Sequence, residues 1–260
     1  MMTGGGRDGR IGLEICVDSV AGARAAIAGG ADRIELCAAL ALGGLTPSQG
    51  LVAAVLAIAG PARIPVHAMV RPRPGDFAYD ADMLALASAE AAALRKQGVE
   101  GLVFGAARDG MLDVAALRAW VDGLARPEAP PALTLHRVVD LLDDPAAAVE
   151  PAIAMGFSRI LTSGGAPSAP AGAATIARMV ARADGRCSIM AGAGVQADNV
   201  AALIAATGIR EVHGSASGAG RPEDEASSKL GFGPNPRLTD INAVARLRHV
   251  IDEITNIGQM

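Results

Sequence analysis

Two cysteines of this sequence occupy matching positions, each two residues after a glutamate. Glu14 precedes Cys16 and Glu35 precedes Cys37, and each pair lies in a short apolar run. Thiolates are the ligands that a soft, low-coordinate ion such as Cu(I) prefers. If the two runs form neighbouring strands about 4.8 Å apart, and the register aligns the cysteines, the two thiols can meet. The spacing differs from that of a zinc site, because the sequence has no C-x-x-C pair.

A second interpretation of these cysteines needs no metal. A free cysteine often serves as a small buried hydrophobic residue, and composition alone favours that role. Met69 and Met190 are the thioether neighbours that a copper site at Cys16 and Cys37 would have. Cys187 begins a later apolar run, and we expect it to be structural. A disulfide between Cys16 and Cys37 is disfavoured in a reducing compartment.

A second set of residues has the types that acid–base catalysis uses. We name Glu35, His67, His136 and His213 as candidate acid–base groups, because carboxylates and imidazoles are the usual proton carriers. Arg71 is the candidate that holds an anionic substrate through charge-assisted hydrogen bonds. The remaining histidine lies on the terminal helix, where a solvated or packing role is expected.

Glycine-rich segments follow the later strands and indicate a possible anion site. The candidate residues for binding a cofactor or anion are Arg137, Thr162, Ser163, Gly164, Gly165 and Gly194. Glycine-rich loops after the last strands of an α/β barrel commonly bind phosphate. Glycines in short loops also serve turn geometry alone, so the pattern permits both roles.

The elements that position these residues alternate along the chain. Eight short apolar runs predict strands, at 13–17, 33–37, 64–70, 101–105, 132–137, 159–163, 187–191 and 211–215. Between and after them, helices are predicted at 19–28, 47–59, 81–97, 113–124, 145–155, 172–183, 197–206 and 238–255, the last after a polar loop at 217–237. Eight strand–helix units predict a single-domain (β/α)₈ TIM barrel over residues 11–260. A doubly wound open sheet is the alternative, but its G-x-G-x-x-G turn is missing after the first strand.

Polar side chains recur with a period of two along five of these strands. Successive side chains of a strand point to opposite faces. The polar alternates are Glu14 and Cys16, Glu35 and Cys37, His67, Met69 and Arg71, Thr134 and His136, and Glu211, His213 and Ser215. We expect this set to face the barrel interior, with the candidate site near the carboxyl ends of the strands. Glu14 and Glu35 also fit purely structural ion pairs deeper in the barrel.

Composition excludes several functional classes. The chain has 260 residues, a net charge of −4 and only 2% aromatic residues, so it lacks the basic surface and stacking platforms of nucleic-acid binders. Its apolar runs are too short to span a bilayer, and its beginning lacks the hydrophobic segment of a signal peptide. We therefore expect a cytoplasmic protein whose residues 1–10 form a disordered leader.

The ordered motifs of this sequence closely resemble those of the CutC family, whose members are described as copper homeostasis proteins. The matching runs are LEICVDSV from 13, GGADRIELC from 29, GGLTPS from 43, IPVH from 64, RPR from 71, GDF from 75, LVFGA from 102, HR at 136, Asp140, LTSGG from 161, DN at 198 and HGSA from 213. The resemblance spans roughly residues 13–216. The sequence departs from the family at Pro74, at Val138 and Val139, and at Ala191 and Ala193.

The resemblance implies a (β/α)₈ barrel, a cytoplasmic location, and assembly into a homodimer or homotetramer. It also implies Cu(I) binding by cysteines placed as Cys16 and Cys37 are. The first functional hypothesis is therefore a cytoplasmic Cu(I)-binding protein of copper homeostasis. The alternative is a metabolic enzyme acting on a small phosphorylated or carboxylate substrate. The polar residues expected near the carboxyl ends of the strands are more numerous than a two-coordinate metal site requires.

Overall fold

Eight parallel strands close into a barrel, as the alternation of apolar runs and helices predicts. The computed structural model describes residues 10–124, 130–218, 225–230 and 237–257. The barrel strands are β1 (Gly12–Val17), β2 (Arg33–Leu36), β3 (Val66–Met69), β4 (Gly101–Phe104), β7 (Ala132–Leu135), β8 (Arg159–Thr162), β9 (Ser188–Ala191) and β10 (Glu211–Gly214). They follow one another around the barrel in chain order, and β10 pairs with β1. The TIM-barrel prediction is confirmed, and the open doubly wound sheet is excluded.

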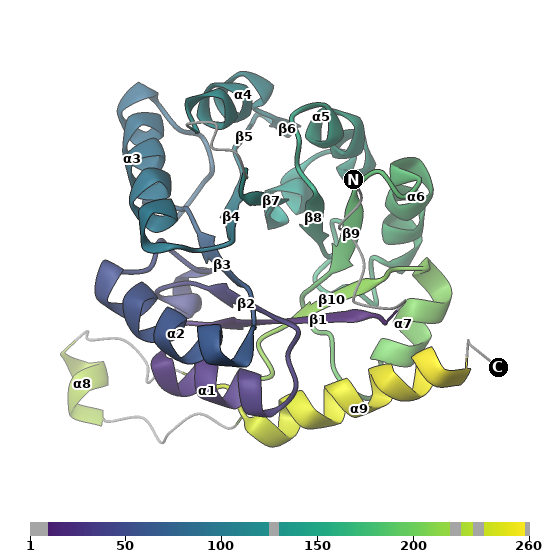
Figure 1. The fold of residues 1–260 in the computed structure, drawn as a ribbon. Helices are drawn as coiled ribbons and strands as arrows, with labels where there is room; N and C mark the ends of the chain where they lie inside the picture. The colour runs from purple at the N-terminus through teal and green to yellow at the C-terminus, as the bar shows by residue number, and fades with distance from the viewer. Residues whose placement is uncertain (1–9, 125–129, 219–224, 231–236, 258–260) are drawn as a thin grey trace.

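Helices surround the strands on the outside of the barrel (Figure 1). They are α1 (Val20–Ala28), α2 (Gln49–Ala62), α3 (Ala81–Gln97), α4 (Val114–Gly123), α5 (Val149–Ala154), α6 (Ala173–Ala183), α7 (Val200–Thr207) and α9 (Ile241–Ile257). The hydroxyl of Ser19 accepts the Gly22 amide at 3.0 Å and so caps the start of α1. Helix α9 packs between α1 and α7 and completes the ring.

Some connections differ from the predicted elements. The helix expected at 145–155 is divided into a 3-10 turn, η4 (Pro145–Ala148), and α5, because Pro151 has no N–H to continue an α-helical ladder. Two further 3-10 segments, η2 (Leu40–Leu42) and η3 (Arg137–Leu141), follow β2 and β7. A small hairpin, β5 (Ala107–Arg108) with β6 (Met111–Leu112), precedes α4. The polar loop expected at 217–237 contains a short helix, α8 (Glu225–Lys229).

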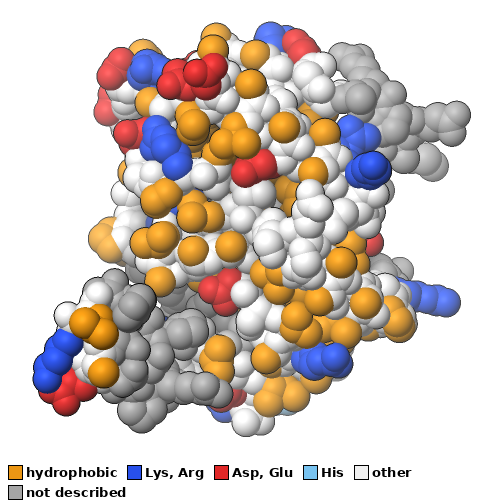
Figure 2. All heavy atoms as spheres, turned by 90° about the vertical axis from the view of Figure 1, so that its left-hand side faces the viewer, with side chains coloured by type: hydrophobic (Ala, Val, Ile, Leu, Met, Phe, Trp, Pro, Cys, Tyr) orange, Lys and Arg blue, Asp and Glu red, His pale blue; other side chains and the backbone are white. Residues whose placement is uncertain are grey.

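The apolar alternates of the strands are buried between the barrel and its helices. Leu13, Ile15 and Val17 of β1 are fully buried, as are Ile34 and Leu36 of β2. The face that carries α2 and α3 shows hydrophobic side chains interspersed with charged ones (Figure 2). None of the helices that the structure describes is long and apolar enough to cross a membrane.

Residues 1–9 of the expected leader lie outside the described residues. Arg10, the last residue of that stretch, forms ion pairs with Asp32 at 3.1 Å and with Asp252 at 3.0 Å. Asp32 also accepts the Leu13 amide at 2.9 Å and pairs with Arg248 of α9 at 2.8 Å. These contacts hold α9 against the end of the barrel where the strands begin, opposite the candidate site.

Candidate functional site

A network of buried ions fills the lower part of the barrel interior. Glu14 accepts a hydrogen bond from the Arg33 guanidinium, and Arg33 also pairs with Glu211 at 3.1 Å. Glu211 pairs with Arg159, whose Nη2 donates to Oε1 at 2.9 Å. Sequence reasoning missed both arginines, although each shares the strand parity of an interior residue. These four residues, Glu14, Arg33, Arg159 and Glu211, form the floor of the barrel.

The floor keeps its carboxylates ionised. Burial alone would raise the pKa of Glu14, but Arg33 and His213 together hold that pKa well below its ordinary value. Burial likewise opposes ionisation of Glu211, and hydrogen bonds from Arg159 with the charge of Arg33 lower its pKa. The floor is therefore a set of paired buried charges, in which loss of one partner would leave the other uncompensated.

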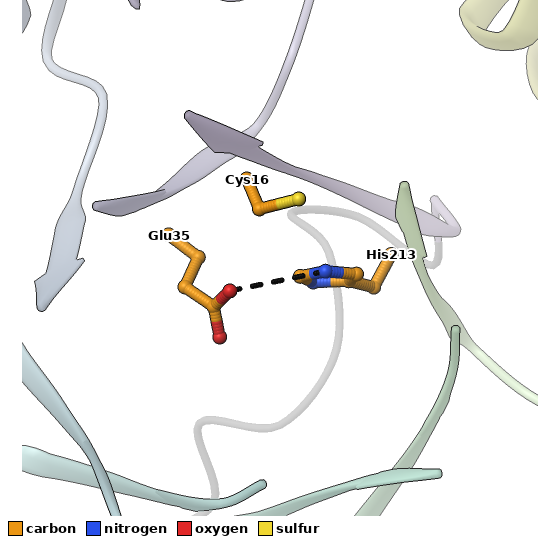
Figure 3. Close-up of side chains that lie close together, drawn as sticks. All are labelled: Cys16, Glu35 and His213. Carbon is orange, nitrogen blue, oxygen red and sulfur yellow. Dashed lines mark ion pairs between the residues drawn. The ribbon is translucent and has the colours of Figure 1, made fainter. Parts of the chain in front are cut away.

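Cys16, Glu35 and His213 meet directly above the floor. One potential ligand atom from each lies within 4.8 Å of the others, and all three residues are buried. They project from the adjacent strands β1, β2 and β10 toward one point (Figure 3). His213 Nε2 lies 3.8 Å from Glu35 Oε2, and His213 Nδ1 lies 2.7 Å from Glu14 Oε1. Glu14 thus orients the imidazole from below, which leaves Nε2 toward the other two groups.

The electrostatics of this cluster favour a charged imidazole. Burial alone would lower the pKa of His213, but its neighbours Cys16 and Glu35 and the bond to Glu14 raise that pKa well above its ordinary value. Burial raises the pKa of Glu35, and His213 partly opposes that rise. Among the described atoms, Glu35 Oε1 has no hydrogen-bond partner. The cluster combines a thiol, an imidazole and a carboxyl group in one buried volume.

The register does not align the two cysteines. Cys16 lies opposite Glu35 in the β1–β2 pair, so Cys37 sits two residues beyond Cys16 along the barrel axis. Cys37 packs with Met69 and Val103 in a separate small cluster. Its thiol lies 3.6 Å from Glu35 Oε2, so both cysteines border the same carboxylate. Burial, with the neighbouring Glu35, raises the pKa of Cys37 well above its ordinary value.

A cavity of about 840 Å³ opens above this cluster at the carboxyl ends of the strands. It brings together a large part of the predicted site. The predicted residues that line it are Cys16, Glu35, Arg71, His136, Arg137, Gly194 and His213. Its wall also includes Met69, the predicted thioether neighbour, and Arg237 and Arg246 near the beginning of α9. The cavity lies where TIM barrels place their binding sites.

His67 is apart from this cavity. Its ring lies against the backbone of Gly101, where a β-carbon would come within 2.5 Å of it. Burial lowers the pKa of His67 to about 3, and Arg33 of the floor adds to the effect. The strand parity thus placed His67 correctly inside the barrel, but at the level of the floor charges rather than in the wall of the cavity.

The glycine-rich loop after β8 already holds an anion, the side chain of Asp140. The Asp140 carboxylate accepts the Thr162 hydroxyl at 2.6 Å, the Ser163 amide at 2.9 Å and the Gly165 amide at 3.1 Å. Gly164 N donates to Thr162 Oγ1 at 2.8 Å. The donors expected to bind phosphate are therefore satisfied within the protein.

Arg137 pairs with the same Asp140, at 2.8 Å. Sequence reasoning gave Asp140 no role, because no local pattern connects it to a loop more than 20 residues away. Its spacing of three residues from Arg137 is the only signal that points to a partner. Arg137 nevertheless remains part of the cavity wall, so a ligand would meet an arginine that is already neutralised.

Arg71 and His136 lie on the wall formed by the ends of β3 and β7. Both contact Phe77, whose ring centroid is 4.7 Å from the Arg71 guanidinium carbon and 4.9 Å from the His136 ring centroid. Phe77 belongs to segment 72–79. Arg73 stabilises this segment by donating hydrogen bonds to Asp76 Oδ1 at 2.6 Å and to Ala78 O at 2.8 Å.

A closed parallel barrel with a buried polar cluster and a cavity at the carboxyl ends of its strands defines a TIM-barrel protein with a candidate binding site. The CutC family model matches residues 11–218. The chain belongs to the CutC family.

Related sequences and a solved structure agree with this assignment. A CutC family protein from Rhizobium meliloti is 46% identical over 94% of this chain and 97% of its own. Another, from Caulobacter vibrioides, is 47% identical over 91% of this chain and 94% of its own. The solved CutC structure from Streptococcus agalactiae has a TM-score of 0.74 and 27% identity over 79% of this chain and 98% of its own. A phosphoribosylanthranilate isomerase from Pyrococcus furiosus, 14% identical with a TM-score of 0.57, shows only that the fold is shared.

Proposed function

We propose that this chain is a cytoplasmic copper homeostasis protein that binds Cu(I) through Cys16 and Cys37. The observation that carries the proposal is the position of both thiols beside one carboxylate, Glu35, at the base of the cavity. Cys16 reaches the cavity directly, and the Met69 thioether lines the same wall. These soft donors are the groups that Cu(I) prefers. The solved relative from Streptococcus agalactiae is named for copper homeostasis.

Two further features support this proposal. Cys16 and Cys37 are both free and buried, so neither proposed ligand is taken up by a disulfide. His213 and Glu35 lie close enough to Cys16 to complete the coordination of a metal or to orient its thiolate. Assembly into a homodimer or homotetramer belongs to the same proposal, and sedimentation of the purified protein tests it.

An anaerobic Cu(I) titration against a chromophoric chelator tests the copper proposal. We expect about one tightly bound ion per chain, with affinity lost when Cys16 and Cys37 are both replaced by Ser. Cys187→Ser is the matched control and should bind as the unchanged protein does, because Cys187 lies at the start of β9, away from the cavity. Tight binding that survives the double replacement contradicts the proposal. Loss on Cys16→Ser with full binding by Cys37→Ser contradicts the two-thiol site.

A metabolic enzyme acting on a small phosphorylated or carboxylate substrate is the second candidate. The size of the cavity favours it, since about 840 Å³ is far more space than one metal ion occupies. Glu35, His136 and His213 supply proton carriers in the cavity wall, and Arg71 supplies a positive charge. Turnover of a carboxylate or phosphate ester that is abolished by Glu35→Gln, while Cu(I) affinity is retained, would support this candidate over the first.

A further inference from the structure

The cavity wall formed by the ends of β3 and β7 carries two N–H groups that no other described residue uses. β7, which precedes His136, lies diametrically across the barrel from β1. Arg71 is 5% exposed and His136 is 4% exposed, yet both border the cavity. Within the part of the chain that the structure describes, neither Arg71 Nε nor His136 Nε2 has a hydrogen-bond partner. Buried polar atoms are normally paired, so two unpaired ones beside a cavity indicate a ligand.

The protonation of His136 is fixed by its surroundings. Its Nδ1 accepts the Val138 amide at 3.1 Å, so the proton of the neutral ring is on Nε2. Burial lowers the pKa of His136 to about 3, and the nearby Arg71 charge adds to this. The ring therefore presents a permanent, uncharged N–H donor.

The guanidinium of Arg71 is held rigidly by the backbone. Nη1 donates to the carbonyls of Leu42 at 2.8 Å and Gly44 at 3.1 Å, and Nη2 donates to the Gly75 carbonyl at 2.9 Å. A guanidinium has five N–H groups, so Nε–H and one Nη2–H remain. No carboxylate of the described chain forms an ion pair with Arg71. The charge is thus uncompensated, and two donors are free on a planar group.

These donors fit a carboxylate better than a phosphate. A planar guanidinium with two remaining N–H groups matches the two oxygens of a carboxylate. The Ser163 and Gly165 amides of the loop after β8 are occupied here by Asp140, so this loop offers a phosphate no free amide of these two residues.

We propose that Arg71 and His136 form a subsite for the carboxylate of a small organic acid, covered by Phe77 when the site is empty. The Phe77 ring packs on both groups. The proposal requires this ring to turn aside when the ligand enters. The subsite goes beyond the copper proposal, and it rests on the second candidate function, to which it gives a substrate class.

The test is calorimetric titration of the metal-free, full-length protein with pyruvate, L-lactate and succinate, and with inorganic phosphate and glycerol phosphate for comparison. We expect saturable binding by at least one carboxylate and weaker binding by both phosphates. Binding should weaken by about tenfold or more in His136→Asn, since the hydrogen bond to a charged ligand is lost. Asn can keep an acceptor for the Val138 amide, so the variant removes the Nε2–H donor with little other change.

Matched variants separate this subsite from the copper site. Arg71→Lys should weaken carboxylate binding to a similar extent, because Lys lacks the planar pair of donors. Arg178→Lys, on α6 and outside the cavity wall, should leave it unchanged. The Cys16→Ser, Cys37→Ser protein should still bind the carboxylate, and His136→Asn should still bind Cu(I).

Proton NMR of the unchanged protein provides a reading that does not depend on how the variants fold. The His136 Nε2–H signal, identified by its absence in His136→Asn, should move when succinate is added. Preferential binding of phosphate, no saturable binding by any of the three carboxylates, or a carboxylate affinity that His136→Asn leaves intact would each overturn the proposal. Loss of carboxylate binding in the double cysteine variant would also overturn it.

Discussion

Replacing His136 with Asn should change how the stability of the protein depends on pH. In the folded chain the pKa of His136 is lowered to about 3, whereas an exposed histidine titrates near 6.5. Between these values the unfolded chain binds a proton at this position and the folded chain does not. Stability from His136 is therefore fully present above pH 6.5 and is lost as the pH falls.

The size of the effect follows from the difference in pKa. Each pH unit below 6.5 removes about 1.4 kcal/mol, so His136 costs about 2 kcal/mol between pH 7 and pH 5. The free energy of unfolding should thus fall less steeply in His136→Asn, by about 2 kcal/mol over this interval. His67, whose pKa is also lowered to about 3, contributes equally to both proteins and cancels in the comparison. His213 cancels in the same way, although its raised pKa acts with the opposite sign.

Urea unfolding at pH 7 and pH 5 measures this difference. Trp120 is the only tryptophan and is 1% exposed against Phe104, so its fluorescence reports loss of the core. His249→Asn, at an exposed ring on α9, removes a histidine from the surface and serves as the control. Equal pH dependence in His136→Asn and the unchanged protein would show that the folded ring takes up the proton. That result would remove the fixed N–H donor from the proposed carboxylate subsite.

Two other predictions concern stability. Asp140→Ala should lower the free energy of unfolding by about 2–4 kcal/mol, because the buried Thr162 hydroxyl and Ser163 amide lose their acceptor. Sulfate should restore part of that loss by binding the vacated amides, and a thermal melt with no sulfate effect would contradict this. Arg159→Met should cost about 3–5 kcal/mol because Glu211 keeps its buried charge with one partner fewer. Adding Glu211→Leu should recover part of the cost in urea unfolding, and additive losses would refute the pairing.

The parity of side chains along the strands predicted much of the interior. Because alternate residues of a strand face opposite sides, Glu14, Cys16 and Glu35 were correctly placed inside the barrel, and their neighbours outside it. The same rule would have assigned Arg33, which shares its face with Glu35. Parity is a local property, so the sequence of one strand is enough to determine it.

The sequence of one strand could not predict the register between β1 and β2, or the contacts of Asp140 with the loop after β8. Whether Cys16 lies opposite Glu35 or Cys37 depends on the stagger between β1 and β2, which the packing of the whole barrel determines. The glycines after β8 are the kind that bind an external anion, but Asp140, on a different loop, fills that role. Only the assembled barrel brings these groups together.

The floor and the candidate site depend on each other through Glu14. This carboxylate is shared between Arg33 below and His213 above, so the charge that pairs with Arg33 in the floor also orients the imidazole beside Cys16. A substitution of Glu14 would therefore change stability and ligand binding together and could not distinguish them. His136 takes its position from the Val138 amide, after β7, across the barrel from β1. For this reason the soft-metal proposal and the carboxylate proposal can be tested separately in one molecule.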